Sequence, residues 1–186
     1  MYKRQAVIRE LFEETGILLA RDSAGTWAPD AESFGSARQE VDAGELKWPA
    51  FLEEHGLEMA CDALHYFAFW VTPVVLPKRW STRFFLAALP PGQQAVHDGK
   101  ELTDSRWLTA RQALDEQQQG RLKLPHPTIR SLEQLVVHDS IGAMHKWADR
   151  LASEGVPRFT SVRREVDGST VWLDPWDPDY PGDDGT

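Results

Sequence analysis

Residues 6–17 combine apolar and acidic side chains at the spacing of an α-helix, and no other stretch constrains the fold as strongly. At about 100° per residue, four large apolar side chains fall within an arc of roughly 140°, and three glutamates fall within roughly 100° on the opposite side. The apolar set is Val7, Ile8, Leu11 and Phe12, and the acidic set is Glu10, Glu13 and Glu14. The pattern predicts a helix with one face in the core and the other gathering negative charge.

That acidic face indicates a binding site for a cation. Like charges three and four positions apart cost an isolated helix about 0.2–0.5 kcal/mol per pair, so a neutralising ion is favoured. Arg9 precedes Glu13 by four residues and can hold that carboxylate, but it cannot neutralise all three. The alternative is a solvated acidic face on an ordinary amphipathic helix.

Residues 9–17, Arg-Glu-Leu-Phe-Glu-Glu-Thr-Gly-Ile, resemble the second half of the Nudix box. This is the signature of hydrolases that cleave a diphosphate linked to another moiety, and every specified position of that half is matched. The resemblance implies that Glu10, Glu13 and Glu14 hold Mg²⁺ or Mn²⁺ and that Arg9 orients them. Carboxylate oxygens are ligands that such hard cations prefer.

The first half of the Nudix box does not precede these residues. Counting back from Arg9, the family's earlier glutamate would fall on Met1, so the chain begins inside the motif. The preceding residues of the family supply the first strands of the sheet. We therefore expect either a longer native protein or a shortened chain with an incomplete sheet, and both remain open.

Three later segments, residues 70–73, 77–87 and 101–108, resemble one Nudix branch. That branch is related to the animal peroxisomal coenzyme A diphosphatase and also carries an inserted helical segment. The likeness runs from about residue 6 to residue 135, and it implies hydrolysis of coenzyme A or acyl-coenzyme A. Two alternatives stay open: another Nudix substrate, such as a nucleotide sugar, a dinucleotide or a nucleoside triphosphate, and a truncated remnant that binds without turnover.

Further site residues are predicted outside the helix. Glu101 stands where Nudix enzymes often place another acidic ligand or base, and Asp104 is the second choice; the alternative is a turn carboxylate. Either Glu13 or Glu101 would accept the proton of the attacking water. Arg79 and Arg83 can grip phosphate oxygens with paired donors, although Arg83 can instead serve a structural ion pair.

The remaining sequence predicts an α/β fold with alternating elements. Strands are expected over residues 63–72, 83–89 and 101–108, and helices over 110–119, 127–138 and 140–153. We predict a helical insert at about residues 31–56 and a loop over residues 21–30. The resemblance implies a Nudix-like α/β/α sandwich with a mixed sheet over residues 1–155. Residues 156–186 form an extension, with a hairpin over 160–172 and a flexible acidic tail from residue 174.

Charge and composition limit the classes of partner. A formal net charge of -9 argues against contact with nucleic acid or an anionic membrane, while local arginines and metal ions can still attract a small diphosphate. The longest apolar run has about ten residues, against roughly 20 for a membrane span.

Cys61 is the single cysteine, which excludes an internal disulfide, and we expect a cytoplasmic protein. The eight tryptophans can include an adenine-stacking surface, but most are expected to pack in the core. The oligomeric state stays open.

Overall fold

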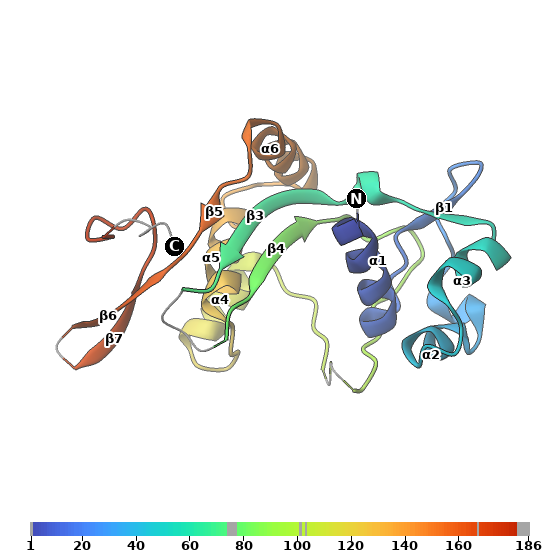
Figure 1. Cartoon of the computed structure of the whole chain (residues 1–186), viewed down its shortest axis with the longest axis horizontal. Coiled ribbons are helices and arrows are strands. Elements are labelled where there is room, and N and C mark those ends of the chain that lie inside the picture. Colours follow the sequence, from blue (N-terminus) through green and yellow to red (C-terminus); the bar gives the residue numbers. More distant parts are fainter. Residues whose placement is uncertain (1, 74–77, 101, 103, 167, 182–186) are drawn as a thin grey trace. The chain divides into compact units, whose positions relative to one another are not determined.

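Helix α1, Tyr2–Thr15, begins the computed structural model of the protein (Figure 1). The structure describes residues 2–73, 78–100, 102, 104–166 and 168–181. The helix predicted at residues 6–17 is present and begins earlier than expected. Ile8 and Phe12 on its apolar face are completely buried. The helical spacing of the sequence therefore places this face correctly in the core.

The chain divides into two units, each with its own core. Unit 1 comprises residues 1–64 and 87–107, and unit 2 comprises residues 65–86 and 108–186. Neither unit is one continuous stretch, because the chain leaves unit 1 after residue 64 and returns to it at residue 87. The division at residue 155 that the sequence suggested stays a prediction.

Unit 1 is mostly helical. After α1 it contains strand β1 (Ala20–Asp22), the 3₁₀ helix η1 (Ala31–Phe34), helices α2 (Ala37–Asp42) and α3 (Trp48–Glu54), strand β2 (Leu57–Met59) and the 3₁₀ helix η2 (Cys61–Ala63). β1 and β2 pair antiparallel, with Ala20 opposite Met59. The predicted insert at about residues 31–56 thus contains η1, α2 and α3, which follow α1 in blue to cyan in Figure 1.

The core of unit 1 lies between α1 and the helical insert. Phe12 stacks on Phe51 with 5.2 Å between ring centres, and Phe34 and Trp48 complete the aromatic cluster. Full burial of a large apolar side chain contributes about 1.5–3 kcal/mol. The insert is therefore part of the support of α1.

Unit 2 is built on a three-stranded mixed sheet. β3 (His65–Val71) is central, β4 (Ser81–Leu86) pairs with it antiparallel, and β5 (Arg158–Phe159) pairs with it parallel. The strands predicted at residues 63–72 and 83–89 correspond to β3 and β4. Trp70 lies opposite Thr82 on one side and Phe159 on the other. Residues beyond 155 thus belong to the same sheet as β3.

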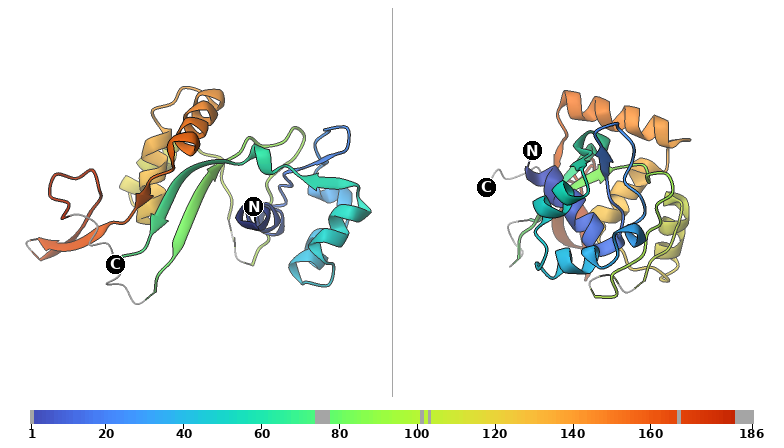
Figure 2. Two further views of the ribbon diagram at one scale, coloured as in Figure 1. Left: turned by 45° about the horizontal axis from the view of Figure 1, so that its top comes forward. Right: turned by 90° about the vertical axis from the view of Figure 1, so that its right-hand side faces the viewer.

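Three helices accompany this sheet, close to their predicted positions. They are α4 (Ala110–Gln118), α5 (His126–Leu135) and α6 (Ile141–Glu154). Thr109 caps α4 in a capping box with Gln112, and the Ser140 side chain caps α6. α6 covers β3 through the buried Ala148, which packs in the same cluster as Phe67 (Figure 2).

The C-terminal segment forms the predicted hairpin but departs from the predicted tail. β6 (Val162–Val166) and β7 (Ser169–Leu173) pair antiparallel, orange to red in Figure 2. Asp174, where a flexible acidic tail was expected to begin, is completely buried. The hydroxyl of Tyr180 donates a hydrogen bond of 2.8 Å to the carbonyl of Thr160. The tail is therefore attached at both of these points.

Two local expectations differ from the structure. Residues 102 and 104–108, within the strand predicted at 101–108, belong to no strand. The Asp98 side chain accepts hydrogen bonds from the backbone amides of Lys100 and Leu102, which closes a turn and removes donors that a strand would need. The loop predicted at residues 21–30 begins inside β1, because Arg21 and Asp22 pair with β2. Arg21 also forms an isolated bridge with Trp27, within the predicted loop.

Among the described residues, no helix combines the length and apolar character that a membrane span requires.

Candidate functional site

Helix α1 ends at a glycine that the local geometry requires. Gly16 has a φ of +74°, and its amide donates to the carbonyl of Phe12 at 2.9 Å. A Cβ at this position would lie 3.3 Å from the Cβ of Ala31 and 3.2 Å from Nη1 of Arg38. Glycine alone adopts this conformation without strain and without crowding the insert. The helix that presents the acidic face therefore ends at Thr15, directly before Gly16.

Arg38, on the insert, completes the end of α1. Its Nε donates to the carbonyl of Glu13 at 3.1 Å. A guanidinium at a helix C-terminus complements the negative end of the helix dipole. Burial lowers the pKa of Arg38, and the nearby carboxylates of Asp98 and Asp42 oppose this shift.

A buried glutamine joins the chain after α1 to the returning segment of unit 1. Gln93 is 4% exposed, and its amide group donates to the carbonyls of Leu18 and Ala28 and accepts from the amide of Leu18, at 2.8–3.0 Å. The amide of Val96 also donates to the carbonyl of Thr15 at 2.8 Å. These bonds attach the residues that follow α1 to the segment around Gln93 and Val96.

The acidic face of α1 is organised by one arginine. Nη1 of Arg9 lies 2.6 Å from both carboxylate oxygens of Glu13, and Nη2 lies 3.5 Å from an oxygen of Glu10. The Glu13 side chain is 11% exposed and that of Glu10 is 54% exposed, while Glu14 is half-buried. Arg9 therefore orients the carboxylate of Glu13, which is less exposed than that of Glu10.

These glutamates suit a hard divalent cation by the chemistry of their donors. Carboxylate oxygens bind Mg²⁺ and Mn²⁺, and the three side chains come from one helix face. Within the described part of the chain, however, no three Asp, Glu, His or Cys side chains are grouped closely enough to hold a metal ion. Both oxygens of Glu13 contact Arg9 instead. In the structure, Glu13 and Glu10 are thus paired with Arg9.

The sequence also predicted acidic site residues outside α1. Glu101 lies outside the described residues. Asp104, the second choice, is exposed, as are its neighbours Ser105 and Arg106.

The two predicted phosphate-binding arginines belong to unit 2. Arg83 lies on β4 with its guanidinium 4.3 Å from the ring centre of Phe69, its cross-strand partner. Burial raises the pKa of Tyr66, and the charge and hydrogen bond of Arg83 oppose that rise. Arg79 is exposed. Arg83 therefore contacts two aromatic side chains, those of Phe69 and Tyr66.

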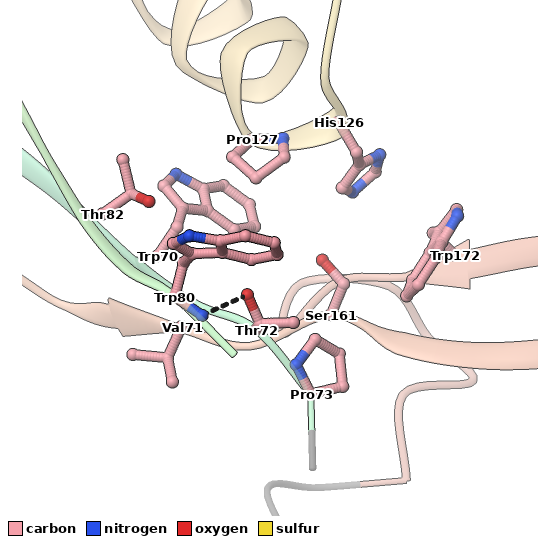
Figure 3. Close-up of a pocket in the computed structure, with 10 residues that line it drawn as sticks. All are labelled: Trp70, Val71, Thr72, Pro73, Trp80, Thr82, His126, Pro127, Ser161 and Trp172. Atoms are coloured by element: carbon pink, nitrogen blue, oxygen red, sulfur yellow. Dashed lines mark hydrogen bonds between the residues drawn. The ribbon is translucent and has the colours of Figure 1, made fainter. Parts of the chain in front are cut away.

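Unit 2 also contains a pocket of about 330 Å³ that the sequence did not reveal. Figure 3 shows its rings arranged around an open space between β3, α5 and the β6–β7 hairpin. The lining rings are those of Trp70, Pro73, Trp80, His126, Pro127 and Trp172. These residues are separated by up to about a hundred positions along the chain. The only signal in the sequence was the abundance of tryptophan.

A buried carboxylate supports one wall of this pocket. Asp174 accepts hydrogen bonds from Ser161 Oγ at 2.7 Å, from Arg130 Nε at 2.5 Å and from His126 Nε2 at 2.9 Å. Burial alone would raise the pKa of Asp174, but the hydrogen bonds from His126 and Ser161 and the charges of His126 and Arg130 lower it. An ionised carboxylate only accepts hydrogen bonds, so Nε2 of His126 carries a hydrogen.

Comparison with protein families gives a match over most of the chain. Residues 2–135 match the model of the NUDT19 Nudix domain. The acyl-coenzyme A diphosphatase NUDT19 of Xenopus laevis is 28% identical over 97% of this chain and 51% of its own length. The human protein of the same name is 27% identical, over 95% of this chain and 50% of its own length. The chain spans about half the length of these relatives.

A solved structure has the same fold. The crystal structure of a Nudix hydrolase from Alicyclobacillus acidocaldarius aligns with a TM-score of 0.66 and 31% identity, covering 75% of this chain and 63% of that one. This likeness confirms the predicted α/β class with a mixed sheet.

Proposed function

This chain belongs to the Nudix hydrolase family, in the NUDT19 branch, and from that premise we propose that it hydrolyses a diphosphate linkage in a nucleoside diphosphate-linked compound. Coenzyme A or acyl-coenzyme A is the first proposed substrate class, because the Xenopus laevis and human relatives are named acyl-coenzyme A diphosphatases. One observation carries the proposal: within the matched residues, α1 buries its apolar face and presents glutamates that Arg9 orients.

In this proposal Glu10, Glu13 and Glu14 hold Mg²⁺ or Mn²⁺. A divalent cation bound there would spread the charge of the diphosphate and lower the pKa of a bound water. Arg9 fixes Glu13 at 2.6 Å, so it sets where that carboxylate can act. Either Glu13 or Glu101 accepts the proton of the attacking water, and Asp104 is the alternative to Glu101.

We place Arg79 and Arg83 in substrate binding. A guanidinium offers paired donors that fit phosphate oxygens, and Arg79 is exposed to solvent. The guanidinium of Arg83 lies over the ring of Phe69, 4.3 Å from its centre. A net charge of -9 makes such local positive groups necessary for an anionic substrate.

A second function, binding without turnover, is favoured by a specific observation. Both oxygens of Glu13 contact Arg9, and the part of the chain that the structure describes brings no three metal-binding side chains together. A chain whose glutamates do not hold a metal ion would bind a nucleotide without cleaving it. Hydrolysis and binding are therefore measured separately.

The test uses the purified chain with coenzyme A and either Mg²⁺ or Mn²⁺. We expect water to add across the phosphoanhydride, which releases 3′,5′-ADP and phosphopantetheine in equal amounts. Glu14→Gln should lower turnover by roughly 100-fold or more, because several kcal/mol of charge stabilisation depend on the cation.

The matched control is Glu54→Gln, which removes an exposed glutamate at the end of α3 and should leave turnover unchanged. Full activity in Glu14→Gln would remove that residue from the proposed site. Binding of coenzyme A without any product would select the non-catalytic function, and cleavage of nucleotide sugars or dinucleotides in preference would change the substrate class.

We propose a cytoplasmic location, on the basis of the single cysteine. Cys61 is free and half-buried, which is compatible with a reducing compartment. A small-molecule diphosphate is the proposed partner, and the acidic net charge disfavours nucleic acid and anionic membranes.

A further inference from the structure

The ring-lined pocket of unit 2 has no role in the proposed cleavage step. Its floor is Trp70, which is 3% exposed and packs on Phe159 with 5.0 Å between ring centres. Its rim includes Trp80, which is 60% exposed although it is a large aromatic residue. The indole of Trp80 therefore offers an accessible aromatic face at the edge of the pocket.

Hydrogen bonds support two parts of the pocket wall. Thr72 and Trp80 exchange two hydrogen bonds, from the amide of Thr72 to the carbonyl of Trp80 at 2.9 Å and from the amide of Trp80 to Thr72 Oγ1 at 3.0 Å (Figure 3). Asp174 holds His126 through Nε2. The first two bonds hold the main chain of Trp80, and the third holds the ring of His126. Wall groups that are held in place lose little freedom when a ligand binds, which favours affinity.

The chemistry of the lining selects a flat ring. Of the described lining residues, Val71 alone offers an open aliphatic side chain, whereas three indoles and an imidazole offer flat faces. A volume of about 330 Å³ lies at the lower end of the range for ligand pockets, roughly 300–1,000 Å³, which suits one ring system better than a whole dinucleotide. Aromatic side chains stack on every nucleobase because each base has a π-face.

We infer that this pocket binds the purine ring of a nucleotide. This inference rests on the proposed function, in which the chain acts on a nucleoside diphosphate-linked compound. Trp80 supplies an accessible stacking face at the rim, and the buried Trp70 supplies a fixed floor.

Two other ligand classes fit the lining less well. A fatty acyl chain favours aliphatic walls, and the described lining is dominated by rings. A quaternary ammonium group is attracted to aromatic faces, and an unpaired carboxylate at the site would strengthen that attraction. Here the carboxylate behind His126 is Asp174, which Arg130 already pairs with at 2.5 Å.

The experiment measures binding of adenosine 3′,5′-bisphosphate to the whole chain by isothermal titration calorimetry, without added metal. Trp80→Ala should weaken binding by about 5- to 100-fold, which is the range for loss of one base–aromatic stack. Trp80→Phe, which keeps a flat face, should bind within about threefold of the unsubstituted chain. Trp107→Ala, which removes a tryptophan that is 73% exposed and lies in unit 1, should bind unchanged.

Equal affinity in Trp80→Ala and the unsubstituted chain would overturn the assignment. Tighter binding of choline or of decanoate than of the nucleotide, lost in Trp80→Ala, would also overturn it in favour of a cation or an acyl chain. The result is separable from the hydrolase proposal. Nucleotide binding that depends on Trp80, without cleavage of coenzyme A, would support the purine pocket and reject the hydrolase proposal. Cleavage of coenzyme A that Trp80→Ala leaves unchanged would support the hydrolase proposal and reject the purine pocket.

Discussion

Arg130 and Asp174 form an ion pair with 2.5 Å between Nε and Oδ2, and the Asp174 side chain is completely buried. The pair joins α5 to the segment that follows β7, and Ser161 and His126 complete the coordination of the carboxylate. A segment whose composition is typical of a flexible tail is therefore anchored by its first aspartate.

Asp174→Asn should destabilise the protein strongly. The substitution leaves Arg130 without its buried partner, and breaking one side of such a pair costs about 3–5 kcal/mol. The melting temperature should fall by roughly 6–20 °C. Asp179→Asn, at an exposed position of the same segment, is the control and should change it little. Similar melting temperatures for the two variants would contradict the anchoring role.

The contribution of the Arg130–Asp174 pair to stability should decrease in acid. The folded-state pKa of Asp174 lies below its ordinary value of 3.8, so its contribution to stability is present above pH 3.8. It is lost as the pH falls through the lowered pKa. The difference in melting temperature between the unsubstituted chain and Asp174→Asn should therefore shrink in strong acid.

Gly16→Ala should cost more stability than Gly25→Ala. Both glycines have positive φ, +74° and +84°, so each alanine pays about 1–2 kcal/mol for the left-handed conformation. Only at Gly16 does the added Cβ also crowd Ala31 and Arg38, at 3.3 and 3.2 Å. Urea unfolding of the two variants measures the difference. Equal decreases in the free energy of unfolding would show that Ala31 and Arg38 move away from the added Cβ at no cost.

Arg9→Ala should reduce activity while leaving the fold largely intact. The Arg9 side chain is 39% exposed, so solvent screens its pairing with Glu13 and its removal should lower the free energy of unfolding by only about 1 kcal/mol. Loss of a group that orients a metal-binding side chain costs roughly 10- to 100-fold in activity or metal affinity. Arg21→Ala breaks another surface pair, with Asp62 at 2.8 Å, and serves as the control. Parallel thermal melts and steady-state kinetics test this expectation, which fails if both variants retain full turnover.

Stability should fall as the pH drops below about 6.5 because of His145. Burial lowers the pKa of this imidazole, the charge of His65 lowers it further, and Asp149 opposes the shift. The two rings stack with 4.0 Å between centres. The unfolded chain then binds more protons than the folded chain below the ordinary value of 6.5, so stability is lost between that value and the lower folded pKa.

His145→Gln isolates this contribution from those of the other histidines. Melting temperatures recorded between pH 5 and pH 7.5 should decline less steeply in the variant than in the unsubstituted chain. Superimposable pH profiles would mean that His145 titrates alike in the folded and unfolded states.

The features that were predictable are those encoded by neighbouring residues. α1, its buried Phe12 and its terminal Gly16 follow from helical periodicity and the conformational freedom of glycine, and the pairing of Arg9 with Glu13 follows from their four-residue spacing. The strand predicted at 101–108 was wrong over its described residues. The side chain of Asp98 takes up backbone amides there, and propensity alone does not weigh such a competing turn.

By itself, the sequence determined the helix, its acidic face and the α/β class, because periodicity acts over a few residues. The tertiary structure alone decided the anchor of Asp174 and the ring-lined pocket. Asp174 meets Arg130 across 44 positions of sequence, and Trp70 and Trp172 reach one cavity only after the sheet, α5 and the hairpin have packed. Local composition rich in Asp, Pro and Gly carries no information about a buried cationic partner so far away, since that pairing depends on where the rest of unit 2 folds.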